Sequence, residues 1–132
     1  MKSFGKPVSC KVRSSVEHID TAIIGSLAVN SMGARIGDGK GYDDLDWAML
    51  YQMGALDRST VVVTLVDSVQ ILDEKVIPNY VMEPHDVPVD VIVTKKTMHH
   101  VAKRLKKPCS GVLQSLVNKK KMAELPALKF FV

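Results

Sequence analysis

The hydrophobic residues of this chain are gathered in short runs, separated by polar and glycine-rich stretches. Three segments are apolar at nearly every position: residues 21–29 (TAIIGSLAV), 60–66 (TVVVTLV) and 88–94 (PVDVIVT). A short run with apolar residues on both faces is typical of a strand buried in a parallel sheet. We therefore expect three buried strands.

A helical pattern lies between the first two of these segments. Four apolar residues recur at the spacing of one helix face: Leu45, Ala48, Met49 and Met53. Asp43 or Asp44 is placed to cap the first turn, and Gly54 to end the last. Trp47 and Tyr51 share one stripe of this helix, and we interpret them as packing residues.

The last part of the chain also contains helical spacing. Met98, Val101, Ala102 and Leu105 predict a helix that Pro108 ends, and residues 111–122 predict a further amphipathic piece. Residues 67–85 predict a short element and a loop. Strands that alternate with helices favour an α/β fold with a mainly parallel sheet and flanking helices.

Composition and charge restrict the class of protein. A chain of 132 residues with 46% hydrophobic and 24% charged residues fits one compact domain. We expect a cytoplasmic protein without a membrane-spanning segment, with Cys10 and Cys109 as reduced thiols.

The charge is divided unevenly along the chain. Residues 1–94 carry 8 Lys and Arg against 13 Asp and Glu, a net −5, whereas residues 95–132 carry 10 against 1, a net +9. We therefore divide the chain into an α/β body, 1–94, and a basic amphipathic helical tail, 95–132. Such a tail is a solvated helix, a surface for anionic lipid or a contact for RNA, although it has no interleaved aromatic residues for base stacking.

A glycine-rich loop, residues 33–44 (GARIGDGKGYDD), connects the first strand to the helix. A strand, a glycine-rich loop and a helix recur where proteins hold phosphate, because backbone N–H groups converge there. The spacing is neither the dinucleotide fingerprint nor the P-loop. Arg35 and Lys40 add two cations that favour a phosphate-binding loop.

The loop resembles the G-x-R-x-G-x-G-K-G-Y-Y-D signature of 5-formyltetrahydrofolate cyclo-ligases. Eight positions match: Gly33, Arg35, Gly37, Gly39, Lys40, Gly41, Tyr42 and Asp44. The resemblance covers roughly residues 19–95, and within the family it is stronger to the methenyltetrahydrofolate synthase domain-containing proteins, through residues 24–29 and 43–46. It implies the C-terminal part of a NagB/RpiA/CoA-transferase-like domain, with the N-terminal half of the family domain missing.

The resemblance also implies a site. Cyclo-ligases use ATP to phosphorylate the formyl oxygen of a reduced folate, after which a neighbouring amine closes the ring. Arg35 and Lys40 would then be catalytic, and a phosphate or nucleotide would be bound by six residues: Gly37, Asp38, Gly39, Lys40, Gly41 and Tyr42. Asp44 and Asp90 would hold magnesium, whose preferred ligands are carboxylate oxygens.

Asp43 departs from the family pattern, because it places a carboxylate where the family has a second tyrosine. Ser26 and Ala28 also stand where the ligases have glycines before the loop, and Asn30 stands where they have an acidic residue. Our interpretation is a degenerate, non-catalytic cyclo-ligase-like domain that keeps the phosphate loop and associates with RNA through its tail or a missing downstream module. The alternative is an active ATP-dependent 5-formyltetrahydrofolate cyclo-ligase, with ATP and magnesium as cofactors and a reduced folate as substrate.

Two further positions have competing interpretations. Asp90 lies in an apolar strand and needs either a partner such as Arg35 or a metal ion, since a buried unpaired carboxylate is costly. Adjacent helical residues point about 100° apart, so His99 and His100 predict a solvated face and not a chelating pair.

Overall fold

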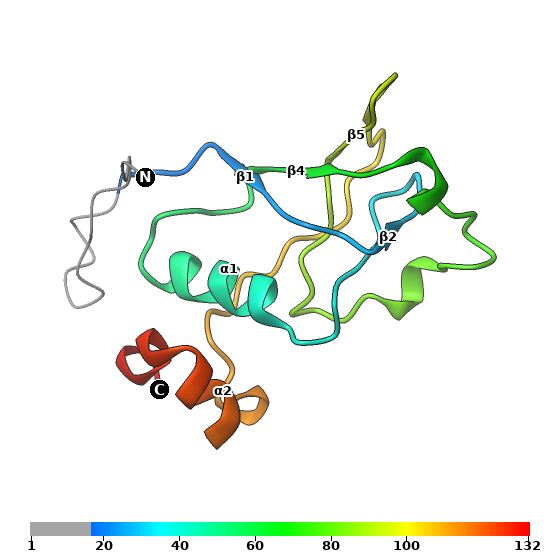
Figure 1. The fold of residues 1–132 in the computed structure, drawn as a ribbon. Helices are drawn as coiled ribbons and strands as arrows, with labels where there is room; N and C mark the ends of the chain where they lie inside the picture. Colours follow the sequence, from blue (N-terminus) through cyan, green and yellow to red (C-terminus); the bar gives the residue numbers. More distant parts are fainter. Residues whose placement is uncertain (1–16) are drawn as a thin grey trace, which may run out of the picture.

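The computed structural model describes residues 17–132, and a four-stranded sheet forms its centre (Figure 1). β1 (Thr21–Ile23), β4 (Val61–Leu65) and β5 (Val91–Val93) are parallel, and β6 (Met98–His100) pairs antiparallel with β5. The strand order is β1-β4-β5-β6. The expected α/β fold with a mainly parallel sheet is confirmed.

The single strand expected over residues 21–29 is wrong, because this segment forms two strands in two sheets. After β1 the chain turns away, and β2 (Ala28–Val29) pairs antiparallel with β3 (Arg35–Ile36). The Ser26 hydroxyl lies 2.7 Å from the Thr64 hydroxyl, which fixes the turn beside β4. Ile23 is 70% exposed because β1 is an edge strand with one open face.

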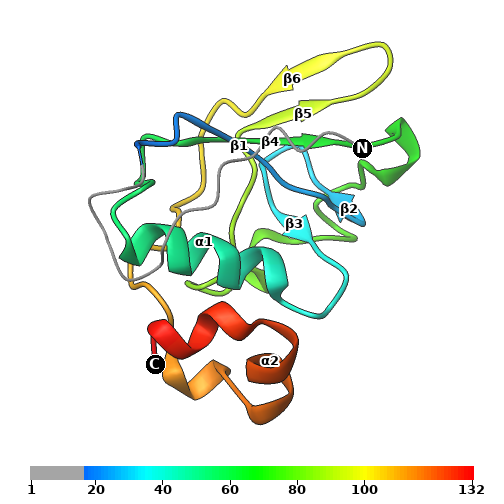
Figure 2. The same ribbon diagram turned by 60° about the vertical axis from the view of Figure 1, so that its left-hand side comes forward.

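Helix α1 (Tyr42–Gln52) covers one face of the sheet (Figure 2). Trp47 is 2% exposed and packs in the main hydrophobic cluster with the sheet, and Tyr51 lies against the same cluster, so the packing interpretation is confirmed. The Trp47 indole N–H also donates to the carbonyl of Pro108, at 3.2 Å. Gly54, with φ of 76°, follows the helix end as expected.

The expected cap at the start of α1 is wrong. Gly41 is the N-cap residue, with φ of 74°, and no side chain caps the helix. Asp43 and Asp44 lie in the first turn, where their charge still complements the helix dipole.

The helix expected from Met98 to Leu105 is also wrong. Residues 98–100 form β6, because the free edge of β5 gains a hydrogen-bonded partner when the chain turns back. The turn is closed by the Thr94 N–H, which donates to the carbonyl of Thr97 at 2.9 Å. His99 and His100 are both exposed, as expected of a solvated segment, and the His99 Nε2 lies 2.9 Å from the carbonyl oxygen of Ser31.

Residues 108–132, here called the C-terminal segment, pack on the side of α1 that faces away from the sheet (Figures 1 and 2). They contain η4 (Gln114–Leu116), α2 (Lys119–Glu124) and η5 (Pro126–Phe130), so the amphipathic piece expected over 111–122 is helical only in part. Leu128 is fully buried against Leu45 and Met49 of α1. Two further short 3₁₀ turns, η2 (Ser68–Gln70) and η3 (Asn79–Val81), lie in the connection from β4 to β5.

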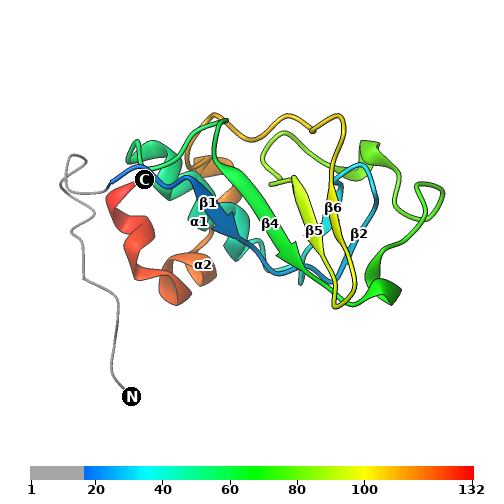
Figure 3. The same ribbon diagram turned by 90° about the horizontal axis from the view of Figure 1, so that it is seen from above.

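The described residues therefore form three layers: the sheet, α1 and the C-terminal segment. Seen from above, the other face of the sheet is covered by no helix of residues 17–132 (Figure 3). Among these residues, no helix is long and apolar enough to cross a membrane. Cys109 is a free thiol, and Cys10 lies outside the described residues.

Candidate functional site

A pocket of about 430 Å³ opens beside the glycine loop, at the start of α1. Three parts of the chain line it: the glycine loop, the end of the connection into β5, and the C-terminal segment. The lining side chains that matter for its chemistry are Arg35, Asp38, Lys40, Tyr42, Asp43, Asp44, His85, Asp86, Ser110, Leu113, Leu116 and Lys121. Every predicted catalytic and phosphate-binding residue lines this pocket, and so does Asp44.

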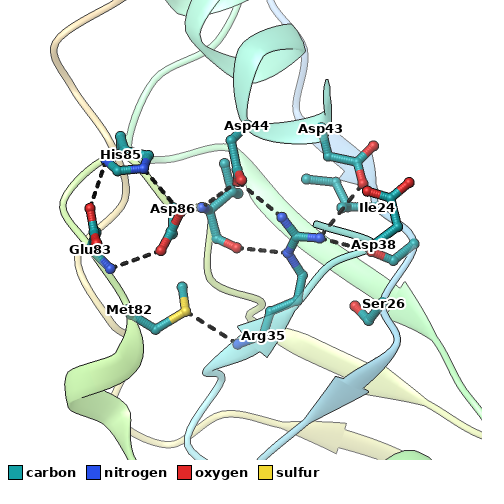
Figure 4. A network of polar contacts seen from close by, with 12 residues as sticks. Ile24, Ser26, Arg35, Asp38, Asp43, Asp44, Met82, Glu83, His85 and Asp86 are labelled. Atoms are coloured by element: carbon teal, nitrogen blue, oxygen red, sulfur yellow. Dashed lines mark hydrogen bonds and ion pairs between the residues drawn. The ribbon is translucent and has the colours of Figure 1, made fainter. Parts of the chain in front are cut away.

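The Arg35 guanidinium is almost fully engaged with the protein (Figure 4). Its side chain is 3% exposed. Nε donates to the carbonyl of Val87 at 3.0 Å, Nη1 to the carbonyl of Gly25 at 2.9 Å, and Nη2 to the Asp44 carboxylate at 2.9 Å. Arg35 therefore joins the turn after β1, the start of α1 and the segment before β5.

Asp44 completes this junction. Its Oδ1 accepts from Arg35 and, at 2.9 Å, from the backbone N–H of Val87. Burial raises the pKa of the Asp44 carboxyl, and the Val87 hydrogen bond and the Arg35 charge only partly oppose this effect. Asp43 is about half exposed and lies 3.6 Å from Arg35 Nη1, so its carboxylate stands at the mouth of the pocket.

The glycine loop is folded around one of its own carboxylates. Asp38 Oδ1 accepts a hydrogen bond from the backbone N–H of Lys40 at 2.9 Å. Gly39 and Gly41 have φ values of 84° and 74°, which side chains rarely adopt, so the turn needs glycine at both positions. Lys40 is exposed, and the structure records no ion pair for it within residues 17–132.

Asp90 lies outside the pocket and has a different partner from the one expected. It is fully buried, and Lys107 Nζ lies 2.9 Å from its Oδ1 and 2.7 Å from its Oδ2. Its Oδ2 also accepts from the backbone N–H of Val62 at 2.9 Å. Neither Arg35 nor a metal ion is needed to satisfy this carboxylate.

The residues expected to hold magnesium do not form one ligand set. Asp44 lines the pocket and Asp90 does not, and both carboxylates already accept hydrogen bonds from cations and backbone amides. No group of three or more His, Cys, Asp or Glu side chains in the described part of the chain is arranged to hold a metal ion. The donor set therefore does not fit a resident magnesium ion.

Several pocket residues have no local sequence pattern that indicates a site. His85 and Asp86 come shortly before residues 88–94, whose pattern predicts a strand and indicates no site. Ser110, Leu113 and Lys121 belong to the C-terminal segment, and no local pattern indicates that this segment returns to the glycine loop.

The sequence pattern also gave no indication that Asn30 holds the start of the loop in place. Its Oδ1 accepts from the backbone N–H groups of Met32 and Ala34, and its Nδ2 donates to Ile77. A buried asparagine of this kind resembles an ordinary turn residue when only its local sequence is considered.

The chain is similar to known proteins over most of its length. A model of the 5-formyltetrahydrofolate cyclo-ligase family matches residues 4–95. Three curated relatives carry the name "Methenyltetrahydrofolate synthase domain-containing protein": the chain is 35% identical to that of Danio rerio over 129 residues and 37% identical to that of Mus musculus over 129 residues. It is 37% identical to that of Homo sapiens over 111 residues.

These matches cover 98%, 98% and 84% of this chain, but 32%, 33% and 28% of the relatives. The chain therefore spans about a third of the length of the curated relatives it matches. The C-terminal segment lies beyond residue 95, where the match to the family model ends.

Proposed function

Because the chain belongs to the 5-formyltetrahydrofolate cyclo-ligase family, we propose that it is a degenerate cyclo-ligase-like domain that binds a nucleotide phosphate in the glycine-loop pocket and does not catalyse the ligase reaction. The proposal extends to this chain a phosphate-binding role that its glycine loop favours. The observation that carries its non-catalytic part is that the Arg35 guanidinium donates its hydrogen bonds to the protein itself.

Arg35 supports a binding role without catalysis. An arginine that stabilises a transferring phosphoryl group needs donors directed at that group. The Arg35 donors instead contact Val87, Gly25 and Asp44, and its side chain is 3% exposed. Lys40 is then the cation of the glycine loop that remains available to a ligand.

The carboxylates of the pocket favour a ligand of low charge. Asp38, Asp43, Asp44 and Asp86 line the same cavity as Arg35, Lys40 and Lys121, so four formal negative charges face three positive ones. Two unit charges about 4 Å apart repel by roughly 4 kcal/mol at an effective dielectric constant of 20. We expect a nucleoside monophosphate to bind at least as tightly as ATP when no divalent cation is added.

Calorimetric titration with adenosine 5′-monophosphate and ATP in the presence of a chelator tests the binding role. Lys40→Gln should weaken the binding of adenosine 5′-monophosphate about tenfold, as expected for one charge-assisted hydrogen bond. Lys75→Gln is the matched control, because Lys75 is exposed and does not line the pocket. No binding of either nucleotide, or equal binding by the Lys40 variant, would contradict the proposal.

Catalysis is tested separately. The alternative function, an active ATP-dependent 5-formyltetrahydrofolate cyclo-ligase, predicts that the chain converts 5-formyltetrahydrofolate when ATP and magnesium are added. We expect no conversion above the uncatalysed rate, followed by ultraviolet absorbance. Steady turnover by the purified chain would overturn the non-catalytic part of the proposal.

RNA association is a second candidate function, favoured by the net +9 of residues 95–132. Lys103, Arg104 and Lys106 are exposed, and the Nε of Arg104 also lies 3.7 Å from Asp90 Oδ1. Lys107 is buried against Asp90 and is not available to RNA. Changing the three exposed cations to glutamine should weaken binding to a single-stranded RNA and reduce its salt dependence, measured by fluorescence anisotropy. Unchanged binding would exclude this surface as an RNA contact.

The free thiol of Cys109 is compatible with action in the cytoplasm, where cysteines are kept reduced.

A further inference from the structure

The glycine-loop pocket has a second wall, which lies outside the part of the chain that matches the family model. Pro108, Ser110, Leu113, Leu116 and Lys121 line it, and the family match ends at residue 95. This wall is held in place by the packing of the C-terminal segment on α1. The pocket therefore exists in this form only while the two parts of the chain stay together.

Lys121 is the cation of this wall, and it lies directly against the glycine loop. A Cβ at Gly41 would lie 3.6 Å from Lys121 Nζ. An ammonium group has three donors. The structure gives Lys121 Nζ one hydrogen-bond acceptor among residues 17–132, the carbonyl of Leu116 at 3.3 Å.

The start of α1 and Lys40 both place positive charge near Lys121, and the carboxylates of the same pocket form no ion pair with it among residues 17–132. Gly41 is the N-cap residue of the 11-residue α1, and no side chain caps this helix. The helix dipole is positive at this end, where a cation is disfavoured. Lys40 places a second ammonium group on the same loop. The Oδ1 of Asp44 is already shared by Arg35 and Val87, and Asp43 lies 3.6 Å from Arg35 Nη1.

The apolar residues of the wall lie in the same pocket. Leu113 and Leu116 of the C-terminal segment and Tyr42 of α1 line it together with the two lysines. Leu113 and Leu116 are 36% and 37% exposed, which is high for side chains of this size. A pocket with cations at one place and apolar side chains at another fits a ligand with an anionic group and a less polar body.

We propose that the C-terminal segment is part of the binding site, with Lys121 contacting the phosphate group of the ligand beside Gly41 and Leu116 contacting its apolar body. This inference rests on the proposed function, since it adds residues to the same pocket. It assigns binding residues that lie beyond residue 95, where the match to the family model ends.

Titration with adenosine 5′-monophosphate tests the role of Lys121. Lys121→Gln should weaken binding about five- to tenfold, as expected for a partly exposed charge-assisted contact, and Lys121→Arg should restore most of the affinity. Lys120→Gln is the matched control: it removes the same charge from the same helix, but Lys120 is exposed and does not line the pocket.

Weaker binding by the Lys121→Gln variant alone supports the inference. Equal binding by the Lys120 and Lys121 variants overturns it, and leaves the proposed function intact if Lys40→Gln still weakens binding. If the unmodified chain binds no nucleotide, both the inference and the proposed function fail.

A second probe separates the two parts of the proposed contact. Leu116→Ser should weaken the binding of adenosine 5′-monophosphate while leaving the binding of inorganic phosphate unchanged, because phosphate lacks the apolar body. Lys121→Gln should weaken both. Loss of phosphate binding in the Leu116 variant, or no loss for either probe, would contradict the assignment of Leu116.

Discussion

Two buried cations, Arg35 and Lys107, each contact an aspartate for which the family resemblance implied a magnesium ligand. Arg35 contacts Asp44, and Lys107 contacts Asp90. Neither pairing follows from the local sequence, because the partners of the second pair lie 17 positions apart and come together only when β5 and the basic segment are folded. The resemblance implied metal ligands, whereas in the folded chain both aspartates pair with buried cations.

The pair of Asp90 and Lys107 leads to a stability prediction. Lys107→Met removes the nearer of two cations from the fully buried Asp90 and leaves Arg104, whose Nε lies 3.7 Å from Asp90 Oδ1. We expect the free energy of unfolding to fall by about 3 kcal/mol. Urea denaturation followed by circular dichroism measures it. Lys106→Met is the control, because Lys106 is exposed and the change should be small. Similar midpoints for the two variants would contradict this role of Lys107.

His18 and Asp57 give a pH prediction at the surface. The hydrogen bond to Asp20, with a further one to Asp57, raises the pKa of His18 above its ordinary value of 6.5. Because the folded pKa is raised, this contribution to stability is complete below pH 6.5 and is lost as the pH rises through the raised value. The pKa of Asp57 is lowered, first by the Ser59 hydroxyl and less by His18, so its contribution is present above pH 3.8 and is lost in acid.

The thermal midpoint of the unmodified chain should therefore fall between pH 6 and pH 8 by more than that of His18→Gln. His100→Gln is the control, since His100 is exposed and no ion pair is recorded for it among the described residues. A pH dependence that is the same in all three proteins would show that His18 has no such role.

At the scale of elements, the strands and the helix with a clear local sequence pattern were predicted correctly. β4, β5 and α1 form where β-branched runs and helical spacing indicate them. The errors occur where contacts between residues distant in the sequence determine the secondary structure. β6 is a strand because the edge of β5 offers it hydrogen-bond partners, although Met98 and Val101 have helical spacing. The chain breaks between β1 and β2 because Ser26 is held beside Thr64.

The C-terminal segment gives a prediction at this scale. Leu128 is fully buried between that segment and α1, and Leu128→Ala should weaken their packing by about 2–3 kcal/mol. Hydrogen exchange should then become faster in residues 112–132 than in the sheet. Val132→Ala, at a position 44% exposed, is the control. Equal protection of the C-terminal segment in both variants would contradict this packing role.

At the scale of the whole molecule, the site is assembled from three parts of the chain. The glycine loop was predictable, because glycines and cations at fixed spacing have a direct local signature. The other two walls were not, since they depend on how residues 81–86 and 108–121 return to it. The Leu128 variant should therefore also bind nucleotide more weakly, although Leu128 itself does not line the pocket.

Trp47 gives the molecule a built-in optical reporter. It is the single tryptophan of the chain, it lies within the hydrophobic cluster below the sheet, and its indole is tied to Pro108, at the start of the segment that forms the far wall. Its emission should be blue-shifted in the native protein and move to longer wavelength when that segment detaches. Opening of the pocket can thus be followed by intrinsic fluorescence, without attaching a dye.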